Sequence, residues 1–294
     1  MKDNSKKAIR TSLVSIFGNG ALALIKGITG ILGNSFALIA DAIESLTDVF
    51  SSLIVFLGLK YSSKSPDENH PYGHGKAEPL VTFIVVVFLL VSATIITIQS
   101  IKNISSPQEA PESYTLLILA GIILIKELFY RFVNKRSDET KSTSLKADAW
   151  HHRSDAITSL MAFIGISISI FMGPGFEAAE DYAALVAAAF IIYNAFLIFR
   201  PALVEIMDEN VHSEIMDQIK DYSMDVPGIL GTEKCLVRKA GMNYYVDLHV
   251  IVSGDICVRE GHLLGHNLKD ALMERIPEIA DVLMHIEPDD HLET

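Results

Sequence analysis

Two long apolar stretches without a single charged side chain constrain the fold of this chain most. Leu80–Ile101 and Tyr182–Phe199 contain no Asp, Glu, Lys, Arg or His. A helix needs about 20 such residues to cross the hydrocarbon core of a bilayer, where no water solvates charges. Both stretches are therefore expected to be transmembrane helices.

Four further apolar runs have a comparable length but contain ionisable residues. They lie near residues 11–32, 35–59, 114–133 and 147–172. Together with the two uncharged stretches they predict a polytopic α-helical membrane protein with six transmembrane helices, which occupy residues 11–204.

The basic residues support six transmembrane helices and set their orientation. At one set of helix ends the arrangement places Lys2, Lys6, Lys7, Arg10, Lys60, Lys64, Lys76, Arg131, Lys135, Arg136, Lys141 and Lys146. The connections at the opposite ends hold Lys102 as their only basic residue. Loops rich in Lys and Arg stay in the cytoplasm, whereas a soluble helical core has no reason to segregate its bases. We therefore expect both termini, including residues 1–10, to be cytoplasmic, in the cytoplasmic membrane of a bacterium or an archaeon.

Residues 205–294 are predicted to form a separate cytoplasmic domain. Acidic and basic residues balance up to residue 200, so the formal net charge of −12 arises in this tail. Its periodicity predicts a helix over 211–224, strands over 233–239 and 244–252, a helix over 258–275 and a strand over 280–287. This α-β-β-α-β order is typical of a small two-layer α+β domain. Both cysteines, Cys235 and Cys257, are predicted to be core thiols.

One nine-residue frame occurs twice in the predicted membrane helices. The first copy, from residue 40, reads ADAIESLTD, and the second, from residue 147, reads ADAWHHRSD. Both begin with Ala-Asp-Ala and end in Asp, and the agreement resumes at Ser52 and Ser159. The frame therefore marks corresponding positions on two helices.

Each copy carries two potential metal ligands four residues apart, Glu44 with Asp48 and His151 with Asp155. Residues four apart share one face of a helix. A charged side chain in a membrane helix costs about 2.5–3.5 kcal/mol on insertion scales, and a bound cation is the simplest compensation for three carboxylates. The four nitrogen and oxygen ligands suit tetrahedral Zn²⁺, although Fe²⁺, Co²⁺, Cd²⁺ or Mn²⁺ also accept them.

Two other acidic residues lie near this predicted site. Asp41 and Asp148 stand three residues before Glu44 and His151, and they are expected to hydrogen-bond to the ligands rather than to bind the metal.

A buried ion-pair network is the alternative to a metal site. In such a network Lys26, Lys126 or Arg153 neutralises the carboxylates. It would explain the charges, but not why both copies repeat the four-residue spacing, so we prefer the metal site.

These helices and paired ligands resemble the cation diffusion facilitator family of metal/proton antiporters. Members of that family carry such pairs on their second and fifth helices, and the matching positions here are Glu44, Asp48, His151 and Asp155. The resemblance runs from about residue 11 to residue 288. It departs at Glu44, because the second-helix pair of the family usually begins with His or Asp, and this leaves the preferred metal open. The resemblance implies a ferredoxin-like cytoplasmic domain that dimerises, hence a homodimer in a lipid bilayer.

A histidine-rich loop follows the second predicted transmembrane helix. The turn-forming residues Pro71 and Gly73 bring Asp67, His70 and His74 together. Taken alone, this pattern fits a metal site and an ordinary solvated turn about equally well. The family resemblance favours a metal site with a regulatory role.

The resemblance also implies metal ligands in the cytoplasmic domain. The expected set is His249, His262, His285 and Glu287, with His266 and Glu233 as further candidates. Bound there, metal would be sensed rather than transported. The family further implies an ion pair between Lys76 and Asp208.

The predicted function is proton-coupled efflux of a divalent transition metal, Zn²⁺ first, with protons as the counter-ion. Two alternatives remain: an Mn²⁺ or Fe²⁺ exporter of the same architecture, and a membrane metal sensor that transports nothing. An enzyme is not expected, because the chain has no phosphate-binding Gly-rich loop, no nucleophile–base set and no phosphorylatable Asp-Lys-Thr-Gly-Thr motif. The distribution of basic residues does not suggest nucleic-acid binding.

Overall fold

The computed structural model describes residues 2–32, 36–105, 114–173, 175–176, 178–210 and 213–289. The chain forms two compact units, one of residues 3–203 and one that contains residues 204–294.

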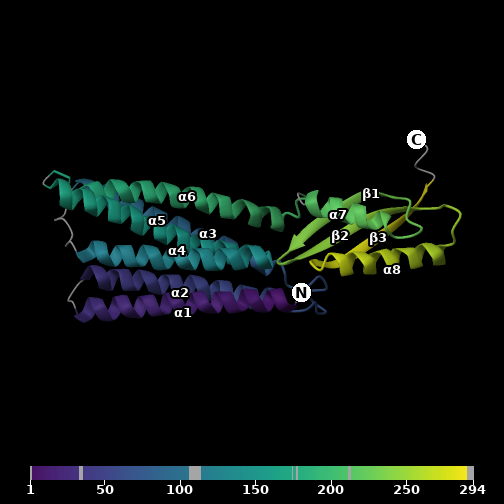
Figure 1. Cartoon of the computed structure of the whole chain (residues 1–294), viewed down its shortest axis with the longest axis horizontal. Coiled ribbons are helices and arrows are strands. Elements are labelled where there is room, and N and C mark those ends of the chain that lie inside the picture. Colours follow the sequence, from purple (N-terminus) through teal and green to yellow (C-terminus); the bar gives the residue numbers. More distant parts are fainter. Residues whose placement is uncertain are drawn as a thin grey trace. The chain divides into compact units, whose positions relative to one another are not determined.

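The first unit is a bundle of long helices that lie side by side (Figure 1). The helices are α1 (Lys2–Leu32), α2 (Phe36–Ser62), α3 (Ala77–Ser105), α4 (Tyr114–Thr140), α5 (Thr143–Met172) and α6 (Ala179–Ile206). Even the shortest, with 27 residues, is about 40 Å long and exceeds the hydrocarbon core of a bilayer. Within the described residues, α1, α3, α5 and α6 are long and apolar enough to cross a membrane.

A tight connection turns the chain from α4 into α5. Lys141 adopts a left-handed conformation with φ of 57°. The next residue, Ser142, is the N-cap of α5, and its hydroxyl accepts a hydrogen bond from the backbone N–H of Leu145. The resulting antiparallel neighbour α4 packs extensively on α5, which also contacts α2 and α3. Ionisable residues in the first half of α5 can therefore meet residues from several helices.

Helix α1 approaches α4 closely at Gly18. A Cβ atom there would lie 2.0 Å from Cζ of Phe129, so the glycine leaves room for that ring. The approach brings the next residue of α1, Asn19, beside α4. Its Oδ1 atom lies 3.5 Å from Nζ of Lys126.

The second unit contains a three-stranded sheet. Its elements are α7 (Ser213–Met224), β1 (Gly231–Ala240), β2 (Asn243–Val252), α8 (Val258–Arg275) and β3 (Ile279–Pro288). The predicted α-β-β-α-β order is confirmed. Strands β1 and β2 are antiparallel and turn at Gly241, whose φ is 64°, while α8 carries the chain across to β3, parallel to β2.

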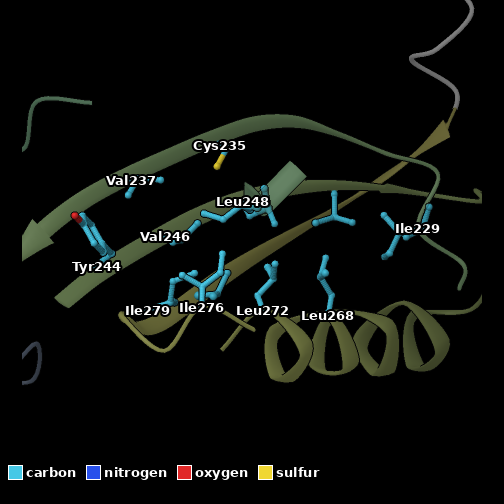
Figure 2. Packing of buried hydrophobic residues seen from close by; sticks show 14 residues of the cluster. Ile229, Cys235, Val237, Tyr244, Val246, Leu248, Leu268, Leu272, Ile276 and Ile279 are labelled. Atoms are coloured by element: carbon cyan, nitrogen blue, oxygen red, sulfur yellow. The ribbon is translucent and has the colours of Figure 1, made fainter. Parts of the chain in front are cut away.

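The core of this unit lies between the sheet and α8 (Figure 2). Along β2 the buried residues alternate, with Tyr244, Val246 and Leu248 on the core face. From α8, Leu268 and Leu272 are fully buried against them. This alternation of strand residues and four-residue helix spacing is the pattern from which the elements were predicted.

The two cysteines occupy different environments. Cys235 is buried in the core on β1, and burial raises the pKa of its thiol to about 11. Cys257 is exposed as the N-cap of α8. The prediction that both are core thiols is therefore wrong for Cys257, which precedes the helix rather than lying on its apolar face.

Candidate metal centre

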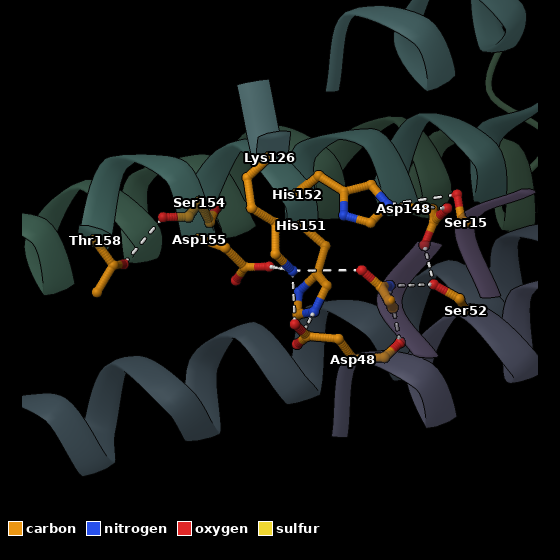
Figure 3. Close-up of polar contacts among 11 residues, drawn as sticks. Ser15, Asp48, Ser52, Lys126, Asp148, His151, His152, Ser154, Asp155 and Thr158 are labelled. Atoms are coloured by element: carbon orange, nitrogen blue, oxygen red, sulfur yellow. Dashed lines mark hydrogen bonds and ion pairs between the residues drawn. The ribbon is translucent and has the colours of Figure 1, made fainter. Parts of the chain in front are cut away.

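Three of the four predicted ligands meet in the middle of the helical bundle. Asp48 of α2 faces His151 and Asp155 of α5, and one ligand atom from each lies within 4.8 Å of the others (Figure 3). The Nε2 atom of His151 is 3.1 Å from Oδ1 of Asp48. Asp48 is about 18 Å along α2 from its first residue, so the cluster lies near the middle of the helix. The side chains of Asp41 and Glu44 lie outside the described residues.

The three ligands line a cavity of about 560 Å³. Hydroxyl groups of Ser51, Ser154 and Thr158 belong to the same lining, together with apolar side chains from α3 and α4. The side chain of Asp155 is 27% exposed, so the cluster is open to the cavity. Carboxylate, imidazole and hydroxyl groups around such a space suit a small divalent cation.

Lys126 of α4 lies between the two aspartates. Its Nζ atom is 2.7 Å from Oδ2 of Asp48 and 2.8 Å from Oδ2 of Asp155, and its side chain is only 3% exposed. Lys126, one of the three cations considered for the ion-pair alternative, therefore pairs with two of the predicted ligands. Arg153, the other described candidate, instead lies over the ring of Tyr130, with its Cζ 4.4 Å from the centroid. The side chain of Lys26 is outside the described residues.

Asp148 lies in a second polar cluster, next to the ligands but directed toward α1 and α2. Its Oδ1 accepts a hydrogen bond from Oγ of Ser52 at 3.1 Å, and Ser52 in turn accepts one from Nδ2 of Asn19 at 3.1 Å. His152 is fully buried beside it, with Nε2 3.4 Å from Oγ of Ser15. The cluster ties α5 to α1 and α2. Sequence reasoning did not identify Asn19 or His152, and only the repeated serine at position 52 gave a signal.

The predicted loop ligands also come together. The Asp67 carboxylate lies 3.0 Å from Nδ1 of His70 and 3.3 Å from Nε2 of His74. Gly73 has a φ of 77°, which permits the turn between the helices. Desolvation raises the pKa of Asp67, but hydrogen bonds from the side chain and backbone of His70 outweigh it and leave this pKa below its ordinary value. The carboxylate thus stays ionised, as a metal ligand must.

In the second unit, three predicted ligands share one face of the sheet edge. The parallel register of β2 and β3 sets His249 directly opposite His285. Oε1 of Glu287 lies 2.6 Å from Nδ1 of His249 and 3.6 Å from Nε2 of His285. A hydrogen bond with the side chain of Glu233 lowers the pKa of Glu287 most; desolvation opposes this shift, and the hydrogen bond with His249 adds to it.

The remaining predicted residues are placed differently. His262 lies on α8 and packs edge-on against His266, with ring centroids 4.5 Å apart. It is not a member of the described group formed by His249, His285 and Glu287. Lys76 and Asp208 belong to different units, so their ion pair stays a prediction.

Two family models match the chain, one for each unit. The model described as the cation efflux transmembrane domain matches residues 12–207, and the model described as the cytoplasmic domain of the cation efflux protein matches residues 211–289.

Proteins of similar sequence match over nearly the whole length. The manganese efflux system protein MneP of Bacillus subtilis is 28% identical over 95% of this chain and 95% of its own length. The cation-efflux pump FieF of Serratia proteamaculans is 28% identical over 95% of this chain and 90% of its own. An uncharacterized transporter of Methanocaldococcus jannaschii is 31% identical over 94% of this chain and 96% of its own.

Proposed function

This chain belongs to the cation efflux family, and on that premise we propose that it exports a divalent transition metal, Zn²⁺ first, from the cytoplasm in exchange for protons. It is a multi-pass membrane transporter for divalent metal cations and not an enzyme. Zn²⁺ as the transported metal and the proton as the coupling ion go beyond what the family membership shows.

The convergence of Asp48, His151 and Asp155 on one cavity supports a single transport site. Two carboxylates and an imidazole are ligands that Zn²⁺ accepts, and Glu44, on the same helix as Asp48, would complete a set of four. A site on rigid helices near mid-bundle suits transport by alternating access, in which the helices expose it to one side and then to the other.

The same side chains supply the proposed coupling to protons. Metal requires ionised carboxylates and a neutral imidazole, so loading displaces protons and protonation displaces metal. The inward proton gradient would then drive metal out of the cell.

The two units divide these tasks in our proposal. Residues 11–204 form six transmembrane helices that carry the transport site, after a cytoplasmic segment of residues 1–10. Residues 205–294 form a cytoplasmic ferredoxin-like domain that senses metal and joins two protomers, and the name of the cytoplasmic family domain is consistent with this location. The loop ligands Asp67, His70 and His74 would hold a second, regulatory ion, and His249, His285 and Glu287 a third.

Mn²⁺ is the second candidate metal. Three carboxylates with one imidazole form a harder set of ligands than a site with two imidazoles, and carboxylates suit Mn²⁺. The similarity to a protein named as a manganese efflux system points the same way.

Reconstituted vesicles that enclose a metal-sensitive dye test the proposal. Metal influx into vesicles with an outward proton gradient should be rapid for the wild type and lost for Asp155→Ala. Asp138→Ala is the matched control, because Asp138 pairs with Lys146 at an exposed position on the same helix pair. Equal flux by Asp155→Ala and the wild type would refute the transport site. Flux compared for Zn²⁺, Mn²⁺, Fe²⁺ and Cd²⁺ identifies the metal, and flux without a proton gradient tests the coupling.

A further inference from the structure

We infer that Lys126 is a tethered cation that competes with the metal for the transport site, so that metal binds there only as the ammonium group leaves. This inference rests on the proposed function and gives a residue outside the predicted ligand set a role in setting the affinity for metal. The ammonium would move toward Asn19.

The ammonium group of Lys126 lies between the carboxylates of Asp48 and Asp155. Its Nζ atom contacts one oxygen of Asp48 and one of Asp155, at 2.7 and 2.8 Å. Zinc–carboxylate distances are about 2.0–2.2 Å, so an ion bound by both aspartates occupies the space between them that the ammonium fills. Two cations in that space would also repel each other strongly in a buried site. The Lys126 ammonium and a metal ion therefore cannot bind the same two carboxylates at the same time.

Burial explains why a lysine is held there. The Lys126 side chain is 3% exposed, and the two aspartates replace the water that its charge has lost. Conversely, two carboxylates in a membrane bundle are costly unless a positive charge accompanies them. Lys126 supplies one such positive charge from within the chain. Protons bound at the site supply the remaining positive charge while the transporter returns without metal.

The structure also offers a place for the displaced group. Oδ1 of Asn19, a neutral acceptor on α1, lies 3.5 Å from Nζ. Asn19 is bound in turn to Ser52, and Ser52 to the buried carboxylate of Asp148. A lysine has a flexible four-carbon stem, so a small rotation carries the ammonium from the aspartates toward this polar path. Figure 3 shows Ser52 and Asp148, the far members of the path.

Competition of this kind weakens the apparent affinity for metal. If Lys126 occupies the site in about nine-tenths of the molecules without metal, the apparent dissociation constant rises about tenfold. Removing the lysine charge should therefore tighten metal binding. A lysine that merely shapes the site predicts the opposite, because its loss would disorder the ligands.

Equilibrium binding of Zn²⁺ to the full-length protein distinguishes these cases. The background carries Asp67→Ala and His285→Ala, so that binding reports the transport site. Lys126→Met, which keeps the length of the side chain, should bind Zn²⁺ about tenfold more tightly, and Lys126→Arg no more tightly than the background protein. Lys146→Met removes the lysine of an exposed ion pair between α4 and α5 and should change nothing. Unchanged or weaker binding by folded Lys126→Met overturns the inference.

A second variant decides the matter if Lys126→Met does not fold. Asn19→Ala keeps Lys126 and the ligands but removes the acceptor for the displaced ammonium, so it should weaken Zn²⁺ binding several-fold. In that case an unchanged affinity overturns the inference. Asp155→Ala in the same background tests the transport site separately from the role of Lys126. If this variant binds Zn²⁺ as tightly as the background protein, the proposed transport site itself is wrong. If Asp155→Ala weakens binding and Lys126→Met does not tighten it, only the role of Lys126 fails.

Discussion

The carboxylate of Glu78 accepts a hydrogen bond from the backbone N–H of Thr143 at 3.0 Å. The same oxygen, Oε2, accepts another from the hydroxyl of Ser142, at 2.9 Å. A residue at the start of α3 thus satisfies the first free N–H group of α5, the helix that carries His151 and Asp155. A negative charge at this position also complements the positive end of the α5 dipole.

Glu78→Ala should destabilise the helical bundle. Glu78 is fully buried, and its loss leaves the Thr143 N–H and Ser142 hydroxyl without this partner. We expect a cost of about 1–3 kcal/mol and a lower melting temperature of the purified protein in detergent. Glu139→Ala is the matched control, because Glu139 forms an exposed ion pair with Arg136 that contributes at most about 1 kcal/mol. Equal melting temperatures for the two variants would contradict a capping role for Glu78.

The adjacent histidines of α5 should separate binding from stability. His151 lines the cavity with Asp48 and Asp155, whereas His152 is fully buried and packs against Phe129. His151→Ala should weaken Zn²⁺ binding at the transport site more than tenfold and leave the melting temperature nearly unchanged. His152→Ala should cost about 2 kcal/mol or more by leaving a cavity while binding stays within about threefold. Zn²⁺ titrations and melting curves of both variants test this. Weaker binding by His152→Ala together with a lower melting temperature for His151→Ala would show that the two roles are assigned wrongly.

The sequence predicted which acidic and histidine side chains come together better than it predicted their surroundings. Four-residue spacing predicted that His151 and Asp155 share a face, and local geometry alone decides that. Lys126 entered only as one of three pairing candidates, because spacing along one helix does not say which neighbouring helix it faces. Asn19 gave no signal for the same reason: its position depends on the close approach of α1 to α4 at Gly18.

The elements of the second unit were predictable almost to the residue. Strand β2 was expected over 244–252 and is observed as Asn243–Val252, because its apolar side chains alternate and both ends have turn residues. The same reasoning failed for Cys257, since a small apolar residue beside a helix carries no periodic signal of its own. The meeting of His249 with His285 depends on the parallel register of β2 and β3, which no local pattern records.

Thiol labelling should distinguish the two cysteines. With its pKa raised to about 11, Cys235 contains very little of the reactive thiolate at neutral pH, and it is buried as well. Maleimide at pH 7.5 should therefore modify Cys235→Ser, which retains the exposed Cys257, about a hundredfold faster than Cys257→Ser. Mass spectrometry of the intact protein follows both reactions. Comparable rates in the folded protein would mean that Cys235 is accessible.

Acid should weaken the second unit partly through Glu287. The pKa of Glu287 lies below its ordinary value of 4.5 in the folded chain. Its ionised form therefore stabilises the fold above about pH 4.5, and this contribution is lost as the pH falls toward the folded pKa. Hydrogen-exchange protection of β3, corrected for intrinsic rates, should fall less between pH 6 and pH 4 in Glu287→Gln than in the wild type. Glu274→Gln, at an exposed position of α8, is the control and should follow the wild type.

Metal binding by the second unit should depend on the sheet histidines and not on those of α8. His249 and His285 face each other across β2 and β3, with Glu287 in reach of both, whereas His262 packs on His266 and is not a member of this described group. The full-length protein with Asp155→Ala and Asp67→Ala, titrated with Zn²⁺, isolates this site. His285→Ala should then abolish one binding event per chain, and His262→Ala should leave the stoichiometry and, within about threefold, the affinity unchanged. A large loss of Zn²⁺ affinity on His262→Ala would contradict this prediction. It would mean that α8 supplies a ligand and that metal binding draws this helix toward the strand edge.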